Sequence, residues 1–401
     1  MYKAILVNKD TWWVGVNDCS TERFEALWSL PNGVAYNAYV VLGEKTAAID
    51  TVKGPWGDEY SYKLEEALGG RDLDYLVVNH MEPDHSGLIL ELRRRWPNLQ
   101  IVGNAKTLPL LKGYYGVTSK TLAVADGDTL DLGGHVLKFA TIPMVHWPES
   151  MVTFDASTGV LFSNDAFGGF GAHEGGLFDD QRERPRWEED MLRYYAAILG
   201  RYSSGVQVAL KKLGGLPIKN IFPAHGTLFR TDAQQVVDLY DRWSRCDTER
   251  GAVVVYGSMY GNTRRMAEAV CTGISESGVK EIRLYDASRT EADFILRDIW
   301  RYCGLALLSC TYNMLLFPPI EALCSKLLNR MPKNHVLGIA GSYSWASGAF
   351  PALRAFAEKA KLDRAEPDVE VFTSPTAEDL ARCEAMGRDL GTKVIAQTED
   401  R

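Results

Sequence analysis

The chain has no Cys-x-x-Cys pair, although it contains seven cysteines among its 401 residues. Zinc ribbons, iron–sulfur clusters and rubredoxin-like iron sites take their thiolates from closely spaced pairs of this kind. The sequence therefore argues against any such site within this chain. Scattered cysteines, odd in number, are typical of reduced thiols in a cytoplasmic protein.

Long apolar runs and an excess of positive charge are also missing. No stretch is apolar enough and long enough to span a bilayer, and the start, Met1–Leu6, has no long apolar core like that of a secretory signal. The net charge of −8 disfavours nucleic acid and acidic membranes as partners. We expect a cytoplasmic protein of two or three domains with no membrane or nucleic-acid partner, since 46% hydrophobic residues allow substantial cores.

The first strand-to-helix turn after residue 250 lacks the Gly-x-Gly-x-x-Gly fingerprint of dinucleotide-binding folds. The apolar run Ala252–Tyr256 is instead followed by Gly-Ser-Met-Tyr-Gly-Asn-Thr and a helical pattern. Backbone N–H groups of such a loop, at a helix N-terminus, favour a phosphate. We therefore place a domain boundary at 249/250 and expect a phosphate-containing cofactor other than NAD in the second domain.

Strands and helices alternate through residues 250–401, which predicts a doubly wound parallel sheet. The predicted strands after the first are Glu281–Tyr285, Gly304–Ser309, His335–Ala340 and Val369–Phe372. The predicted helices are Arg264–Ser275, Glu291–Trp300, Pro319–Leu328, Ala352–Lys361 and Ala377–Ile395. The ligand of such a sheet lies at the carboxyl ends of its strands, where the loops 258–263, 309–313 and 341–348 follow.

Residues 1–249 show many short strands with helices between them, which fits an αββα sandwich. The predicted strands include Ala35–Leu42, Thr46–Asp50, Tyr75–Asn79, Val136–Thr141 and Gly159–Ser163. The predicted helices include Tyr60–Leu68, Gly87–Trp96 and Trp187–Leu199.

The most informative segment follows the apolar run Tyr75–Val78. It places His80, Glu82, Asp84 and His85 within six positions. In an extended segment the first three would project to one side, because strand side chains alternate. Ligand-type groups packed this closely repel or desolvate one another unless a cation compensates.

Three further candidate ligands, each after a short apolar stretch, are His146, Asp165 and His225. Together the seven residues supply four imidazoles and three carboxylates, enough for two metal ions that share one carboxylate. Oxygen-rich sets without thiolate suit iron or manganese, and zinc remains possible.

The order His-x-Glu-x-Asp-His, then His, Asp and His, resembles the metallo-β-lactamase-like domain of the flavodiiron proteins. Hydrolases of that fold usually carry a second histidine where this chain has Glu82. The resemblance implies two non-haem irons. One would bind His80, Glu82 and His146. The other would bind Asp84, His85 and His225. Asp165 would bridge the pair.

The second domain resembles flavodoxin, and the resemblance is specific in the loop Ser258-x-Tyr260-Gly261-Asn262-Thr263. It implies that the cofactor is flavin mononucleotide (FMN) and that Ser258, Asn262 and Thr263 hold its phosphate. The family usually has a hydroxyl residue where this chain has Tyr260. Trp345, with Tyr343 as the alternative, would stack on the flavin ring. The full predicted set of FMN contacts is Ser258, Met259, Tyr260, Gly261, Asn262, Thr263, Thr311, Tyr312, Asn313, Ser342, Tyr343, Trp345 and Gly348.

The family resemblance covers essentially the whole chain and implies an oxidoreductase that reduces O₂ to water, NO to N₂O, or both. Electrons would come from an external donor: a rubredoxin-like protein, a flavin reductase or a reduced deazaflavin. The resemblance also implies a head-to-tail homodimer, or a dimer of such dimers, in which the flavin of one subunit lies near the diiron site of its partner.

Four further residues are candidates for the pocket or its surroundings. The resemblance suggests that the Tyr195 hydroxyl donates to a bound diatomic molecule, with helix packing as the alternative, and that Trp147 packs either against flavin or in the core. Glu25 replaces a histidine found in many family members, and we interpret His173 as part of a loop rather than of the pocket.

Two other functions compete with the flavodiiron hypothesis. One is a dinuclear zinc hydrolase fused to a regulatory flavodoxin-like domain, and the other is a module that senses O₂ or NO without turnover. Glu82 and the phosphate loop disfavour the first, and the full ligand set disfavours the second.

Overall fold

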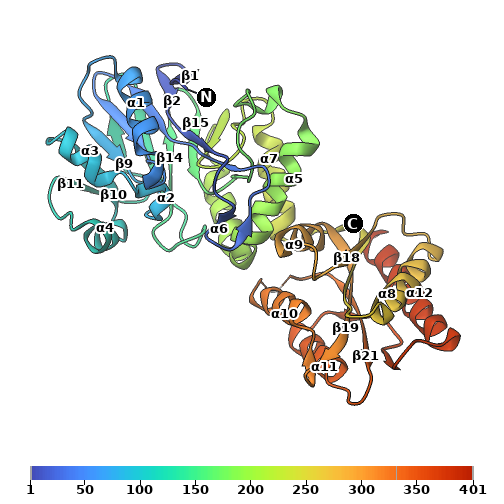
Figure 1. Ribbon diagram of the computed structural model, residues 1–401. Coiled ribbons are helices and arrows are strands. Elements are labelled where there is room, and N and C mark those ends of the chain that lie inside the picture. Colours follow the sequence, from blue (N-terminus) through green and yellow to red (C-terminus); the bar gives the residue numbers. More distant parts are fainter. Residues whose placement is uncertain (1, 331, 400–401) are drawn as a thin grey trace. The chain divides into compact units, whose positions relative to one another are not determined.

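The computed structural model describes residues 2–330 and 332–399. The chain divides between Asp241 and Arg242 into two compact units (Figure 1). This point lies inside helix α7 (Ala233–Ser244), a little before the predicted boundary at 249/250. Each unit has its own sheets and core, so each is described by itself.

The first unit contains two mixed sheets with the strand orders β1-β2-β7-β8-β9-β10-β11 and β12-β13-β14-β15-β16. The strands of the first sheet are β1 (Ile5–Asn8), β2 (Thr11–Trp13), β7 (Tyr39–Leu42), β8 (Thr46–Ile49), β9 (Tyr75–Val77), β10 (Gln100–Asn104) and β11 (Thr121–Val124). Those of the second are β12 (Thr129–Asp131), β13 (Val136–Thr141), β14 (Met151–Asp155), β15 (Val160–Asn164) and β16 (Asn220–Pro223). Short pairs outside them are β3 (Val16–Asp18) with β6 (Val34–Tyr36), and β4 (Arg23–Phe24) with β5 (Trp28–Ser29).

Apolar side chains from both sheets form one buried core. Val41 and Val77 of the first sheet pack in the same cluster as Phe139, Phe162 and Phe222 of the second. Helices α1, α3 and α4 flank the first sheet, and α5, α6 and α7 gather on the other side of the unit (Figure 1). This arrangement confirms the predicted αββα sandwich. Its helices are α1 (Gly57–Leu68), α2 (Pro83–Ser86), α3 (Ile89–Arg95), α4 (Thr107–Tyr115), α5 (Arg184–Tyr194), α6 (Ser203–Leu213) and α7, with short 3₁₀ turns at Gly54–Trp56, Asp179–Gln181 and Gly200–Tyr202.

Some predicted elements of this unit are interrupted where it forms its site. The predicted strand Ala35–Leu42 is two strands, because the backbone N–H of Asn37 leaves the sheet and donates to Ala224 O at 2.7 Å. The predicted helix Trp187–Leu199 begins at Arg184 and widens into a π-helical turn at Tyr195–Leu199. Such turns are frequent at functional sites.

The second unit is the predicted doubly wound parallel sheet. Its strands lie in the order β18-β17-β19-β21, and β22 and β23 each pair with different residues of β21; all of these pairs are parallel. Its strands are β17 (Glu249–Gly257), β18 (Ile282–Asp286), β19 (Tyr302–Tyr312), β21 (Val336–Tyr343), β23 (Val369–Phe372) and the short β20 (Leu315–Leu316) and β22 (Asp363–Arg364). Its helices are α8 (Asn262–Glu276), α9 (Ala292–Arg301), α10 (Pro318–Arg330), α11 (Ala349–Ala360) and α12 (Ala377–Glu399).

Helices cover the sheet of this unit on both faces (Figure 1). α8 and α12 bury Met266, Val270, Met386 and Leu390 against it. The central strands β17 and β19 read as continuous apolar runs because both of their faces are buried. The loops that we predict to bind phosphate follow the carboxyl ends of these strands.

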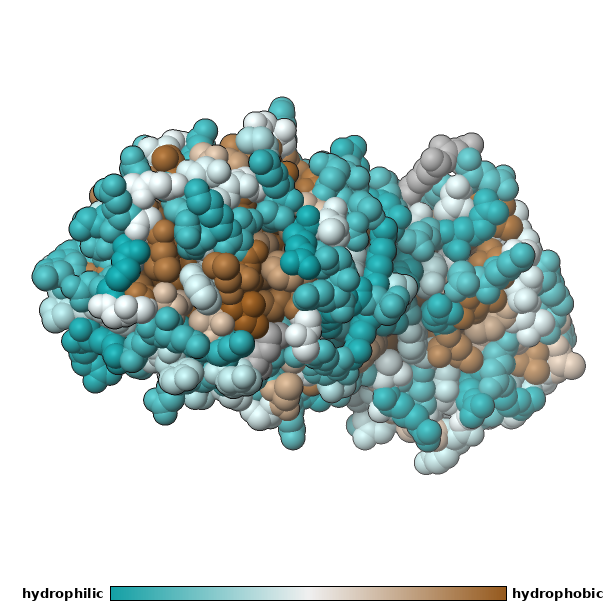
Figure 2. Space-filling model, turned by 90° about the horizontal axis from the view of Figure 1, so that it is seen from above, coloured by the Kyte–Doolittle hydropathy of each residue, from teal (hydrophilic) through white to brown (hydrophobic). Residues whose placement is uncertain are grey.

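Among the described residues, no helix is both long and apolar enough to cross a membrane. The surface view is mainly hydrophilic with separate apolar areas (Figure 2), which agrees with the charged composition of the chain.

Candidate functional site

The seven predicted metal ligands come together where strands of the first unit end. His80 follows β9, Asp165 follows β15 and His225 follows β16. Glu82, Asp84 and His85 lie on or next to the short helix α2, and His146 lies in the connection from β13 to β14. Loops at strand ends let side chains from distant parts of the sequence converge without interrupting the sheets.

Asp165 lies at the centre of the cluster, and its two oxygen atoms face different histidines. Oδ2 is 3.4 Å from Nε2 of both His80 and His146. Oδ1 is 3.1 Å from Nε2 of His85 and 3.4 Å from Nε2 of His225. This is the arrangement expected of a carboxylate that serves two adjacent cations.

Each pair of histidines also faces a second carboxylate. Glu82 Oε2 is 3.2 Å from His80 Nε2 and 3.1 Å from His146 Nε2. Asp84 Oδ2 lies 3.6 Å from His85 Nε2 and 3.5 Å from His225 Nε2. The seven side chains therefore form two groups that meet at Asp165.

The expectation of an extended segment that sends His80, Glu82 and Asp84 to one side is wrong. Helix α2 begins at Pro83, directly after Glu82, so the chain turns helically before Asp84. His80 and Glu82 join one group, whereas Asp84 joins the other with His85.

The side chains of the cluster are buried or nearly so, and their pKa values depend strongly on one another. Burial by itself would raise the pKa of Asp165, but His85, His146 and His225 hold that pKa well below its ordinary value. Burial would likewise lower the pKa of His225, yet the carboxylates of Asp165 and Asp84 beside its ring raise that pKa to about 10. The protein alone thus favours imidazolium–carboxylate pairs, and a divalent cation would take the place of those protons.

The donor set fits two metal ions. Among the described residues, Asp84 Oδ1, Asp165 Oδ2 and His225 Nε2 are buried without a hydrogen-bond partner. Such atoms are costly to leave unsatisfied, and Asp165 Oδ2 and His225 Nε2 both face other members of the cluster. Four imidazoles and three carboxylates, without thiolate, suit iron or manganese, as the sequence predicts.

A tyrosine hydroxyl contacts Asp165, and it belongs to Tyr194, the chain neighbour of the candidate site residue Tyr195. The Tyr194 hydroxyl donates to Asp165 Oδ1 at 2.9 Å. The hydroxyl of Tyr195 lies 3.0 Å from Ser203 Oγ instead, and its ring packs against Tyr240. A tyrosine pair on one helix identifies the region from sequence but does not say which hydroxyl faces the site.

Asn37, which sequence reasoning missed, holds the loop that carries His225. Its side-chain Nδ2 donates to Pro223 O at 3.0 Å and to Gly226 O at 2.9 Å. Its Oδ1 accepts from Trp13 Nε1 and from His173 Nε2, both at 2.9 Å. His173 is therefore a buried support behind this loop. Burial is the main reason that its pKa falls to about 3.

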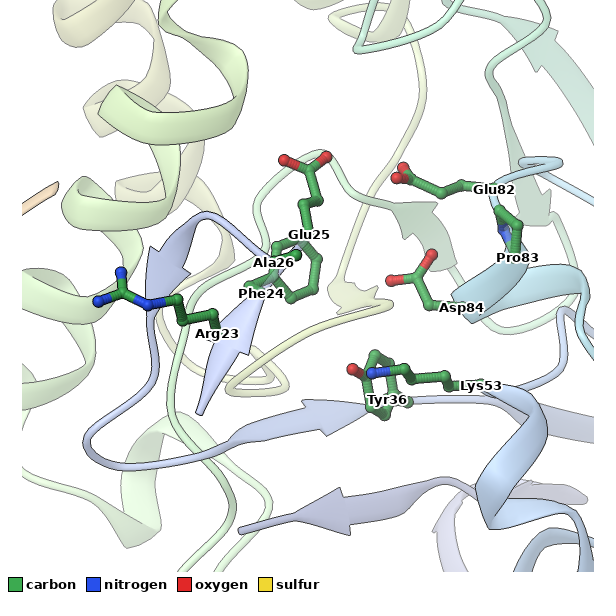
Figure 3. A pocket seen from close by; sticks show the side chains of 9 residues that line it. All are labelled: Arg23, Phe24, Glu25, Ala26, Tyr36, Lys53, Glu82, Pro83 and Asp84. Carbon is green, nitrogen blue, oxygen red and sulfur yellow. The ribbon is translucent and has the colours of Figure 1, made fainter. Parts of the chain in front are cut away.

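A cavity of about 270 Å³ opens on the Glu82 and Asp84 side of the cluster. Figure 3 shows the carboxylates of Glu25 and Glu82 on opposite walls of it, with Lys53 and Tyr36 below Asp84. Glu25 stands at the tip of the β4–β5 hairpin, where its φ of 50° is in the left-handed region. The hairpin thereby places a carboxylate at the mouth of the metal cluster.

The second unit has a polar cleft at the carboxyl ends of its strands. Eight of the predicted FMN contacts line it: Ser258, Met259, Tyr260, Asn262, Thr263, Thr311, Ser342 and Tyr343. Gly261 precedes helix α8 with a φ of 90°, which leaves the N–H groups of the helix start facing the cleft. Thr263 Oγ1 and Ser342 Oγ are 2.9 Å apart, so two of the strand-end loops are joined at the cleft floor.

The other predicted contacts do not line the cleft in this structure: Gly261, Tyr312, Asn313, Trp345 and Gly348. Trp345 is 78% exposed beside it, and the Gly348 N–H donates to Thr311 Oγ1 at 3.2 Å. Cys310, Ser344 and Thr373 line the cleft but were not predicted as contacts. Thr373 follows β23, so its position after the fifth strand was the available signal.

Comparison with known proteins gives two family matches. Residues 34–226 match the model of the ODP family beta lactamase, and residues 254–386 match that of flavodoxin. Each match lies within one of the two units and contains the cluster or the cleft described above.

Full-length relatives carry both parts in the same order. The nitric oxide reductase of Moorella thermoacetica is 32% identical over 98% of this chain and 100% of that protein. The anaerobic nitric oxide reductase flavorubredoxin of Escherichia coli is 31% identical over 96% of this chain and 82% of that protein.

Solved structures agree. The flavodiiron protein of Giardia intestinalis is 28% identical, with a TM-score of 0.95 over 100% of this chain and 98% of that one. The rubredoxin oxygen:oxidoreductase of Desulfovibrio gigas is 26% identical, with a TM-score of 0.93 over 98% and 99%. The chain belongs to the flavodiiron protein family.

Proposed function

We propose that this protein is an oxidoreductase that reduces O₂ to water, NO to N₂O, or both, at two non-haem irons supplied with electrons through FMN. The division of the two Asp165 oxygens between two histidine pairs carries the proposal. The names of the relatives support both substrates, since they include nitric oxide reductases and an oxygen oxidoreductase.

His80, Glu82 and His146 would hold one iron, and Asp84, His85 and His225 the other, with Asp165 bridging. Two irons held there would supply the site at which the diatomic molecule is bound and reduced, and bound FMN would supply electrons to the irons singly or in pairs. Tyr194 would keep the bridging carboxylate in place through its hydroxyl. The cavity beside Glu82 and Asp84 would admit the substrate, with Glu25 at its mouth.

In the second unit, Ser258, Asn262 and Thr263 would bind the FMN phosphate with the N–H groups of the loop. Tyr343, which lines the cleft, and the exposed Trp345 are the candidates to stack on the flavin ring. The buried contact between Thr263 and Ser342 fixes this loop before the cofactor binds.

We further propose a head-to-tail homodimer in the cytoplasm. Large apolar side chains are exposed around the flavin cleft, among them Met259, Tyr260, Met314, Leu315 and Trp345, and a partner surface would cover them. All seven cysteines are thiols, as expected in a reducing compartment. The electron donor would be a rubredoxin-like protein, a flavin reductase or a reduced deazaflavin.

The test is turnover by the purified protein under anaerobic conditions with a chemical reductant and a small redox mediator. Addition of O₂ or NO should then consume the gas at a rate proportional to enzyme, and N₂O should form from NO. Absence of both activities from protein that contains iron and FMN would contradict the proposal and favour a sensing role.

A further inference from the structure

A carboxylate outside the seven candidate ligands contacts one of them directly. Glu149 lies in the connection between His146 and β14 and is 1% exposed. Its Oε1 accepts from His80 Nδ1 at 2.7 Å and from the Met81 backbone N–H at 3.1 Å. Buried carboxylates are rare unless they are paired, and the partner of this carboxylate is a candidate metal ligand.

The contact determines which nitrogen of His80 faces the cluster. With Nδ1–H donating to Glu149, Nε2 faces Glu82 Oε2 at 3.2 Å and Asp165 Oδ2 at 3.4 Å, and its lone pair would bind a metal ion that displaces the Nε2 proton. Trp147 packs edge-on against the His80 ring, with centroids 5.0 Å apart. These two contacts hold the orientation of the ring and keep Nδ1 turned away from the cluster.

His225, which belongs to the other group, has a weaker partner. Its Nδ1 donates to a neutral backbone carbonyl, Ala35 O, at 2.9 Å. A hydrogen bond to a carboxylate is stronger than one to a neutral acceptor, and it makes the ring a more basic ligand. The two groups thus differ in how strongly a histidine is supported from outside.

We propose that Glu149 is a positioning residue for the metal position formed by His80, Glu82 and His146. By holding Nδ1–H of His80, it directs Nε2 at the metal and strengthens that ligand, which raises the affinity of this position for ferrous iron. The proposal rests on the ligand assignment made above and extends it by one residue.

The chain contains a matched control. His135 Nδ1 donates to Asp155 Oδ2 at 2.8 Å, and both residues are buried in the same unit. This pair belongs to neither ligand group. Asp155→Asn therefore removes a similar buried charge without touching the metal cluster.

The experiment titrates Fe²⁺ alone, without oxygen, into FMN-loaded full-length protein from which iron has been removed. In Glu149→Gln, one of the two irons should bind about 10- to 100-fold more weakly, while the other stays within about twofold. In Asp155→Asn both affinities should stay near those of the wild type. Mössbauer spectra of ⁵⁷Fe-loaded Glu149→Gln should show a change in only one of the two iron signals.

A second pair of variants separates positioning from general damage. In His80→Ala the added change Glu149→Gln should weaken iron binding no further, because Glu149 acts through that ring. Should Glu149→Gln not fold, the same titration of Glu149→Asp decides, with a loss at one position only. Unchanged binding in the Glu149 variant, or equal weakening in Asp155→Asn, would overturn the proposal. A wild-type protein that binds no iron would instead refute the proposed function.

Discussion

The candidate metal cluster of the first unit and the candidate flavin cleft of the second unit offer different kinds of groups to a cofactor. The cluster uses ionisable side chains, buried or nearly so, which lie in two groups of imidazoles and carboxylates. The cleft uses hydroxyls and the start of a helix at a sheet edge, with Tyr260 91% exposed beside it. Side-chain identity determines the first site, whereas loop position in the fold determines the second.

This difference predicts different responses to substitution. Loss of the ligand shared by both groups of the cluster should abolish metal binding at both positions, because no neighbouring side chain can replace it. Loss of one hydroxyl in the cleft should cost a single hydrogen bond among several.

Asp165→Ala should have the largest effect. Since its two oxygens face both histidine pairs, iron should be lost from both positions while FMN stays at the wild-type level. Elemental and flavin analysis of the purified variant measures both at once. Retention of both irons would mean that Asp165 does not bridge them.

Thr263→Ala should weaken FMN binding by about tenfold, the equivalent of about 1.4 kcal/mol for one lost hydrogen bond. Fluorescence titration of FMN into flavin-free protein measures this. Thr272→Ala is the control, because Thr272 lies on the same helix but its hydroxyl contacts Glu268 O on the exposed side. Iron should be retained in both variants, and equal loss of both cofactors would indicate misfolding instead.

Tyr194→Phe should lower iron affinity several-fold, because a hydrogen bond to a charged group contributes about 1.5–3 kcal/mol and part of that supports the bridging position. Tyr195→Phe is the matched neighbour, whose hydroxyl contacts Ser203. The same Fe²⁺ titration compares the two variants. A larger effect in Tyr195→Phe would mean that the Tyr194 hydroxyl does not support the bridging position.

His173→Gln should have the smallest effect of these variants. It should change the free energy of unfolding little near neutral pH and measurably in acid. Burial keeps the pKa of His173 near 3 in the folded protein, against about 6.5 when unfolded. Below pH 6.5 the unfolded chain therefore binds a proton that the folded chain does not bind, and this stabilises the unfolded state. The contribution of His173 to the free energy of unfolding is lost as pH falls from 6.5 towards 3. Between pH 7 and 5 that loss is about 2 kcal/mol.

Urea unfolding of iron-free wild type and variant at both pH values measures this. The Gln side chain can still donate to Asn37, so the variant should lose about 2 kcal/mol less than the wild type between pH 7 and 5. Equal losses in the two proteins would mean that His173 is not held neutral.

The two sites also differ in what their sequence could reveal. The seven candidate ligands were found because their residue types are unusual at such spacing, and the flavin loops because strand and helix alternate around them. The role of Glu149 was not predictable, because a lone glutamate three residues after His146 has no distinguishing pattern. Its contact with His80 depends on how two distant loops fold together.

The same limit explains the errors in detail. Asn37 breaks the predicted strand Ala35–Leu42 because its partners, Pro223, Ala224 and Gly226, are almost 190 residues away. The choice between Tyr194 and Tyr195 depends on the rotation of α5 relative to the sheets, which periodicity near a π-helical turn does not determine.

The most direct test of the account is the iron and FMN content of the purified wild-type protein, by elemental analysis and by absorbance after denaturation. We predict two irons and one FMN per chain. Zinc without flavin would contradict the account and favour the hydrolase alternative.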